Sequence, residues 1–127
     1  MNIQISQKNS PIEYSTALNR IGGDRTFLSE LLRVYLNDFS IRYSKLKNAI
    51  RKKNFFLLHK QGHELKGASA NLSMPLLEQL SYQMEQAGKE KNIKKAKTTL
   101  EELYREYVRL SNFILLREIT SKNCLRR

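Results

Sequence analysis

Cysteine is nearly absent from this sequence, and the single residue, Cys124, lies three positions from the C-terminus. One thiol allows no internal disulfide and excludes metal clusters built on several thiolates. Long apolar runs are also missing: no stretch approaches the roughly 20 consecutive apolar residues of a membrane span, and the opening residues lack the apolar core of a secretory signal. We therefore expect a cytoplasmic protein that does not insert into a membrane.

Glycine and proline are scarce, with five and two residues among 127, and apolar residues recur at helical spacing almost throughout. There is no internal repeat and no β-rich run. The sequence predicts an all-α fold, an antiparallel up-and-down four-helix bundle with a short additional N-terminal helix. We expect a flexible N-terminal arm over residues 1–11, the bundle over residues 12–118 and a basic C-terminal tail over residues 119–127.

The expected helices are separated by residues that suit helix ends. The short first helix, over residues 11–21, should stop at Gly22–Gly23. The fourth helix should carry Pro75 in its first turn and end at Gly88. The side chains expected to cap the helices that follow the first are, in chain order, Asp24, Asn54, Ser73 and Asn92.

Acidic residues are outnumbered, since 23 lysines and arginines face 12 aspartates and glutamates, for a net charge of +11. Such an excess favours an acidic partner, which could be a nucleic acid, an anionic membrane surface or an acidic protein patch. The basic run Lys89–Lys97 could attract any of them. The sequence shows no recognition-helix pattern and few aromatics among its basic residues, which argues against nucleic acid. A basic helical adaptor or nucleic-acid-associated bundle is the alternative to the function developed below.

Both histidines lie in the stretch "HKQGHELKGASANLS", four residues apart on the expected third helix. On a helical wheel, Leu58 and Leu65 share the stripe that faces the bundle, and His63 falls about 140° from Leu58, on the outer face. Small residues follow it there: Gly67 one turn on, and then Ala70. A glycine inside a helix costs about 1 kcal/mol relative to alanine, and clearance for another molecule beside the imidazole would compensate.

An exposed imidazole beside a cation suits reversible phosphorylation of a ring nitrogen. A histidine of ordinary pKa, about 6.5, is mostly neutral and nucleophilic at cytosolic pH. Lys66, three residues after His63, can neutralise charge on an attached phosphoryl group. His59 lacks both the lysine and the glycine at those spacings, so we interpret it as a solvated neighbour or a minor docking contact.

Other chemistries have less support in the residues. His59 and His63 could ligate a transition metal, but the segment around them supplies no third ligand and lacks the HExxH pattern. Glu85 would have to be recruited from elsewhere in the chain, and we predict no metal site. No serine or cysteine has a recognisable nucleophile context. Without a glycine-rich phosphate loop the chain should not bind ATP, which suits a phosphocarrier better than a kinase.

The segment "HELKGASANLS" is similar to the signature of histidine phosphotransfer (HPt) domains, His-x-Leu-Lys-Gly-x-Ser/Ala-x-x-x-Gly. The segment "ALNRIGGDRTFLSELLRVYLNDF" resembles the first two helices of that family and "LLEQLSYQMEQAGKEKN" its fourth helix, so the resemblance spans roughly residues 12–115. It implies a four-helix bundle that relays a phosphoryl group between receiver-domain aspartates and has no kinase activity. The glycine usual ten residues after the histidine is Ser73 here, which leaves the geometry of that turn open.

Carried over position by position, the resemblance assigns His63 as the phospho-accepting residue, Lys66 as the residue that steadies the phosphoryl group, and Gly67 as the residue that leaves room for it. A side chain on the next helix often orients the ring in this family. An ungapped count places Glu85 there, where many members have glutamine, with neighbouring alternatives at Gln86 and Gln83, and Lys89 matches a position that is basic in some members.

The partners implied by the resemblance are the receiver domains of a hybrid histidine kinase and of response regulators. We expect the receiver to supply Mg²⁺, the protein to need no cofactor of its own, and the chain to act as a monomer. The side chains expected to contact a partner are Phe56, His59, Ala70 and Tyr82.

Overall fold

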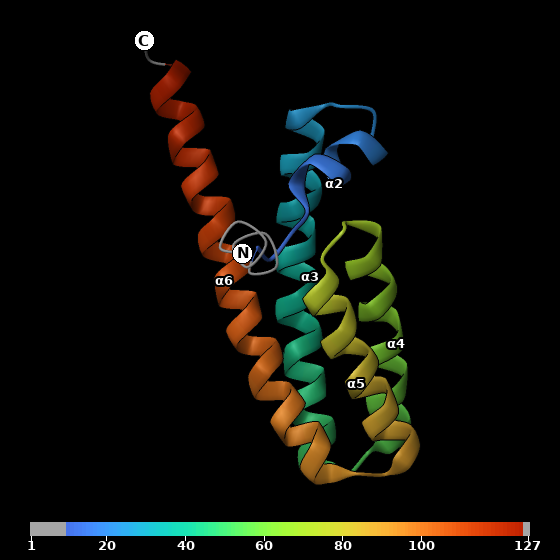
Figure 1. The fold of residues 1–127 in the computed structure, drawn as a ribbon. Helices are drawn as coiled ribbons and strands as arrows, with labels where there is room; N and C mark the ends of the chain where they lie inside the picture. The colour runs from blue at the N-terminus through green and yellow to red at the C-terminus, as the bar shows by residue number, and fades with distance from the viewer. Residues whose placement is uncertain (1–9, 126–127) are drawn as a thin grey trace, which may run out of the picture.

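The structure, a computed structural model, describes residues 10–125 and, within them, the side chains of residues 10–119. Its helices, drawn in Figure 1, are α2 (Tyr14–Arg20), α3 (Arg25–Lys52), α4 (Phe55–Asn71), α5 (Pro75–Glu90) and α6 (Ile93–Leu125). Each of the four long helices runs antiparallel to the one before it (Figure 1). The prediction of an all-α bundle with one short helix in front of it is therefore confirmed.

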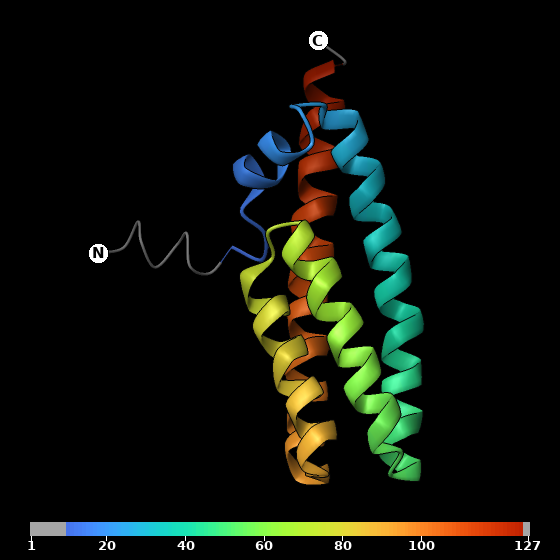
Figure 2. The same cartoon turned by 90° about the vertical axis from the view of Figure 1, so that its right-hand side faces the viewer.

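The four long helices form a ring in which α4 packs against α3 and α5, and α6 packs against α3 and α5. The face formed by α4 and α5 is thus opposite the face formed by α3 and α6 (Figures 1 and 2). The helices α3 and α6 extend beyond the turn that joins α4 to α5, and α2 lies beside the part of them that extends (Figure 2). No helix within the described part of the chain has the length and apolar character needed to cross a membrane.

Apolar residues at helical spacing fill the interior of the ring. Each fully buried leucine contributes about 1.5 to 3 kcal/mol to stability relative to an exposed one. The helix α3 buries its seam at Leu28, Leu32, Tyr35, Phe39 and Leu46, and α6 buries Ala96, Leu103, Leu110 and Ile114. The predicted inward stripe of α4 is confirmed by Leu58 and Leu65, each at most 1% exposed.

One carboxyl group lies inside this core. Glu106 is 3% exposed; its Oε1 accepts a hydrogen bond from Arg109 Nη1 at 2.6 Å, and its Oε2 is buried without a hydrogen-bond partner within the described residues. Burial raises the pKa of Glu106 above its ordinary value, and Arg109 offsets only part of that effect. Helical periodicity predicts an apolar residue at this position, which belongs to the apolar stripe of α6, so it does not predict a buried carboxyl group there.

Three of the four predicted helix caps are confirmed. The side chain of Asp24 accepts a hydrogen bond from Phe27 N at 3.0 Å, and Asn54 accepts one from Leu57 N at 3.1 Å. Asn92 Oδ1 accepts from Lys95 N at 3.0 Å. Each bond satisfies a backbone N–H that has no partner within the helix.

The prediction that Ser73 caps α5 is wrong, because Met74 occupies the N-cap position and Ser73 instead follows Leu72, the C-cap of α4. Ser73 is left-handed, with φ 56°, and Met74 N donates to Ser69 O at 3.0 Å across the turn. A glycine normally supplies this conformation, which explains why the HPt signature that this segment resembles has glycine at the position. The helices α3 and α5 end in the same way, with Lys53 at φ 55° and Lys91 at φ 56°.

Other predicted boundaries also differ. The helix α2 begins at Tyr14, three residues later than predicted. The helix α5 continues through Gly88 to Glu90, for a packing reason given below. The helix α6 runs to Leu125, beyond the predicted domain boundary at residue 118, and residues 126–127 of the predicted tail lie outside the described residues. Residues 1–9 of the predicted arm also lie outside them, whereas Pro11 is buried and Glu13 N donates to Ser73 O at 2.9 Å.

Candidate functional site

The helices α4 and α5 approach each other backbone to backbone at two glycines. A Cβ added to Gly62 would lie 2.5 Å from Glu85 N, and one added to Gly88 would lie 2.5 Å from His59 N. Carbon and nitrogen atoms do not approach this closely without a bond, so only glycine fits at either position. Gly88 therefore extends the contact between the helices instead of ending α5. The contact at Gly62 sets Glu85 beside the turn of α4 that carries His63.

His63 is accessible at one nitrogen and held at the other. Its side chain is 64% exposed, and its Nδ1 lies 3.2 Å from Oε2 of Glu85. An ionised carboxylate only accepts hydrogen bonds, so this contact assigns the proton of the neutral ring to Nδ1. The lone pair is then on Nε2, which forms no hydrogen bond with any of the described residues.

Glu85 is the centre of a small charged cluster between the two helices. The residue is 9% exposed; Lys66 Nζ lies 3.0 Å from its Oε1, and His59 Nε2 lies 3.6 Å from its Oε2. Burial opposes ionisation of this carboxyl group, but the contacts with Lys66 and His63 outweigh it and hold the pKa of Glu85 below its ordinary value. The carboxylate therefore remains ionised at neutral pH.

The surface beside His63 is open. A Cβ added to Gly67 would meet no atom within 4 Å, so the protein itself does not require glycine at this position. Lys66 lies between Glu85 and an aromatic side chain, with Nζ 5.2 Å from the centroid of the Tyr82 ring. Tyr82 is 48% exposed and Phe56, two turns before His63, is 76% exposed. These two residues expose aromatic surface on α4 and α5, the helices that carry His63 and Glu85.

The predicted site residues fall into two groups. The structure brings His63, Lys66, Glu85 and, at a longer distance, His59 together. Gln86 and Lys89, on α5, form no hydrogen bond or ion pair with His63 in the described structure. The neighbouring alternative Gln83 borders a different pocket, with Lys94 and Lys95. Ala70 is half-buried, and its carbonyl oxygen accepts a hydrogen bond from Arg20 of α2 at 2.8 Å.

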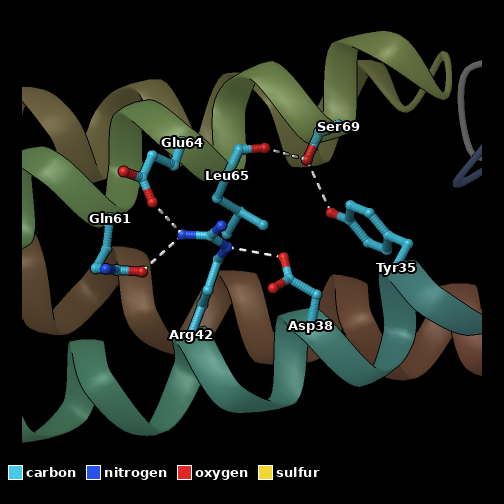
Figure 3. Close-up of polar contacts among 7 residues, drawn as sticks. All are labelled: Tyr35, Asp38, Arg42, Gln61, Glu64, Leu65 and Ser69. Atoms are coloured by element: carbon cyan, nitrogen blue, oxygen red, sulfur yellow. Dashed lines mark hydrogen bonds and ion pairs between the residues drawn. The ribbon is translucent and has the colours of Figure 1, made fainter.

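Polar contacts on the inner side of α4, drawn in Figure 3, fix the helix against α3. Arg42 Nη1 donates to Gln61 at 2.8 Å and to Glu64 at 2.7 Å, and its Nε donates to Asp38 at 2.8 Å. The bonded residues of α4, Gln61 and Glu64, flank His63 in the sequence, so these bonds restrain the turn of α4 that carries the imidazole. Sequence reasoning missed them; the one local signal is the i,i+4 spacing of Asp38 and Arg42.

A second contact in Figure 3 explains the small residue of the signature at position 69. Ser69 Oγ is fully buried; it donates to Leu65 O at 2.8 Å and lies 2.8 Å from the hydroxyl group of Tyr35. The one hydroxyl proton of Ser69 is engaged with the carbonyl, so Tyr35 is the donor in the second bond. A larger residue at position 69 would separate α4 from α3.

No group of three His, Cys, Asp or Glu side chains with the spacing of a metal site occurs among the residues whose structure is described. The carboxylate that His59 and His63 share is also engaged by an ammonium group, which would compete with a metal ion for it.

Comparison with known proteins identifies the family. A family model described as the Hpt domain matches residues 30–113, which is more than half of the chain. The chain belongs to the Hpt family. Hpt domains are phosphocarriers rather than enzymes, and the match supports a role in histidine phosphotransfer within two-component signalling. The matched region includes the whole α4–α5 site of this Hpt domain. Neither the curated proteins nor the solved structures compared with the chain gave a match.

Proposed function

We propose that this Hpt protein relays a phosphoryl group between receiver-domain aspartates in a multistep phosphorelay, with His63 as the residue that carries it. The observation behind this proposal is that the exposed side chain of His63 leaves Nε2 without a hydrogen bond to the described residues, while a buried carboxylate holds Nδ1 at 3.2 Å. An orientation of this kind has little use in a solvated side chain. It is what a nucleophile requires, because the reacting lone pair must point at the incoming phosphorus atom.

In the proposed step, the lone pair of His63 Nε2 attacks the phosphorus of an aspartyl phosphate on the donor receiver. The N–P bond forms as the P–O bond to the aspartate breaks, and the aspartate leaves as a carboxylate. Because Nδ1 keeps its proton, the ring acquires positive charge as the N–P bond forms. Glu85 lies 3.2 Å from Nδ1 and stabilises that charge, as a preorganised group should. The reverse sequence on a second receiver regenerates the neutral imidazole.

Lys66 is assigned to the phosphoryl group. Its ammonium lies 3.0 Å from Glu85 in the unphosphorylated protein, on the same exposed side of α4 as His63. A phosphoryl group on Nε2 would carry more negative charge than Glu85 and would compete for this cation. Gly67 leaves space for the partner. The receiver is expected to bring the Mg²⁺, so the bundle needs no cofactor for its part of the reaction.

A receiver would dock across α4 and α5, with Phe56, Ala70 and Tyr82 at its boundary and His63 at the centre. Exposed aromatic side chains around a reactive group provide affinity without blocking it. We propose that the protein acts as a monomer, because one α4–α5 face contains every residue assigned to the reaction. We also propose a cytoplasmic location, where it would meet the receiver domains.

The direct test is to incubate the protein with a receiver domain carrying a radiolabelled aspartyl phosphate. The wild-type protein should acquire label that survives alkali and is lost in acid, as a phosphoramidate is. The variant His63→Gln should acquire none. His59→Gln is the matched control, because it removes an imidazole one turn away that contacts the same carboxylate, and it should remain labelled.

Failure of the wild-type protein to accept label from any receiver, together with salt-sensitive binding to DNA or RNA, would support the alternative of a nucleic-acid-associated bundle. Label that persists in His63→Gln and is lost in His59→Gln would move the function to the other imidazole.

A further inference from the structure

A groove lies between the C-terminal part of α3 and the N-terminal part of α6, at the lower end of the bundle in Figure 1. Its volume is about 620 Å³, larger than the other pockets described on the molecule. None of the residues assigned to phosphotransfer contributes to it. The residues that line it are Ser44, Lys47, Asn48, Ile50, Arg51, Lys53, Ile93, Lys97 and Leu100.

The charge at this groove is of one sign. Four of the lining residues, Lys47, Arg51, Lys53 and Lys97, are cationic, and no lining residue is acidic. None of the four forms an ion pair with a carboxylate in the described structure; Arg51 instead donates to the amide oxygen of Asn48. Cations held close together without counter-charges create a positive potential that attracts an anionic group and weakens as salt rises.

The floor of the groove is apolar. Ile50 is 7% exposed, and Ile93 and Leu100 are partly buried against the core. A shallow basic surface for a phosphate backbone needs no such floor, because phosphate contacts are made by exposed cations and backbone amides. An apolar floor with a cationic rim suits an acidic segment of a partner protein. An apolar side chain of that segment would insert between the helices, and its carboxylates would pair with the cations of the rim.

The position of the groove adds a geometric argument. It lies on the face formed by α3 and α6, whereas His63 and Glu85 lie on the opposite face, formed by α4 and α5 (Figures 1 and 2). A partner seated in the groove would leave the imidazole accessible. Both sites could therefore be occupied at the same time.

We infer that this α3–α6 groove is a docking site for an acidic protein segment that inserts an apolar side chain over Ile50, Ile93 and Leu100 and pairs its carboxylates with the four cations. A second copy of the chain fits poorly as the occupant, since two chains of net charge +11 repel each other. The inference does not depend on phosphorylation of His63.

The test uses the full-length protein with isotope-labelled isoleucine and leucine methyl groups, titrated with a short synthetic peptide of glutamates around a central pair of leucines. Binding should shift the methyl signals of Ile50, Ile93 and Leu100 and leave those of Ile12 and Ile114, which are buried elsewhere, unchanged. A peptide with the leucines replaced by serines should bind at least about tenfold more weakly, because the floor is then unused.

A matched pair of variants separates the groove from the overall charge. Lys47→Glu with Lys97→Glu should weaken peptide binding by at least about tenfold, whereas Lys45→Glu with Arg105→Glu should change it less than about twofold. Both pairs reverse one exposed cation on α3 and one on α6, but only the first pair lines the groove. At a saturating concentration of phosphorylated receiver, where encounter is not limiting, the labelling of His63 should be the same in all of these proteins.

Four results would overturn the inference. The first is that the methyl signals of the groove do not shift, and the second is that both variant pairs weaken peptide binding equally. The third is that the serine peptide binds as tightly as the leucine peptide. The fourth is that an oligonucleotide causes the same methyl shifts and binds more tightly than the leucine peptide. Failure of phosphotransfer alone would count against the proposed function and not against the groove.

Discussion

Replacing Gly67 by alanine should make the fold more stable and phosphotransfer slower. A Cβ at this position meets nothing within 4 Å, and the residue lies inside α4, which ends at Asn71. The substitution therefore introduces no clash and gains the difference in helix propensity, about 1 kcal/mol. For a domain of this size, that difference should raise the melting temperature by about 4 °C.

The effect on function should have the opposite sign, because we propose that the space at Gly67 accommodates the partner. The added methyl group projects from the helix one turn beyond His63, where a receiver must approach. We expect a several-fold slower transfer in Gly67→Ala and about 100-fold slower transfer in Gly67→Leu, the loss typical of a displacement of roughly 1 Å between reacting groups. Rapid-quench labelling with a phosphorylated receiver measures the rate, and calorimetry measures the stability.

Ser40→Leu is the matched control, since Ser40 is exposed on α3, away from the site, and the substitution adds similar bulk. It should leave the transfer rate unchanged. Transfer to Gly67→Leu at the wild-type rate would refute the assignment of Gly67 as clearance. A fall in stability of Gly67→Ala would refute the claim that the glycine has no structural role.

Other substitutions test the packing. Gly62→Ala should lower the free energy of unfolding by about 2 to 3 kcal/mol in urea denaturation, because its Cβ would lie 2.5 Å from Glu85 N; an unchanged midpoint would contradict the close helix contact. Ser73→Gly should raise the same free energy by about 1 kcal/mol, since it removes left-handed strain and a buried hydroxyl that has no hydrogen-bond partner among the described residues. A lower value would show that the turn does not need glycine's conformation. Glu106→Gln should stabilise the fold by about 1 kcal/mol near pH 8, because burial raises the pKa of Glu106 and its ionised form opposes folding. This gain should shrink as the pH falls through that raised pKa, since the native carboxyl group then becomes protonated; a gain that grows toward acid pH would contradict the sign of the shift.

Replacing Glu85 separates orientation from charge. Glu85→Gln keeps an acceptor for Nδ1 but loses the negative charge beside the ring and the pairing with Lys66, so it should retain part of the transfer rate. Glu85→Ala removes both effects and should be slower, by roughly 10-fold or more relative to Glu85→Gln. Equal rates in the two variants, measured by receiver-dependent labelling, would show that the carboxylate does not orient His63.

The helices and the exposed position of His63 could be predicted from the sequence because both follow from the spacing of apolar residues. The caps at Asp24, Asn54 and Asn92 could be predicted for a similar reason, since each depends on one side chain and the backbone three residues later. Ser73 shows the limit of that reasoning. A serine suits the N-cap of a helix, but in this protein Ser73 has the left-handed conformation that follows a helix end. The sequence around it does not distinguish these two roles, which depend on how α4 packs against α5.

Contacts between helices could not be predicted in the same way. Gly88 has the sequence context of a helix end, but its role depends on the backbone of His59, which lies 29 positions earlier in the chain. An ungapped count did place Glu85 opposite His63, yet the count contains no information on Lys66 and His59, which contact the same carboxylate. The burial of Glu106 was missed because a charged residue in an apolar stripe is ordinarily assigned to the edge of that stripe.

The glycines at positions 62 and 88 make α4 and α5 a single rigid unit, since backbone atoms and not side chains determine their separation. The distance between His63 and Glu85 is therefore insulated from the rest of the interior. Substitutions can accumulate on α3 and α6 and change the stability of the bundle or its surface, while His63, the proposed nucleophile, keeps its orientation. Such a division would let related proteins diverge in their connections to other proteins without having to rebuild the chemistry.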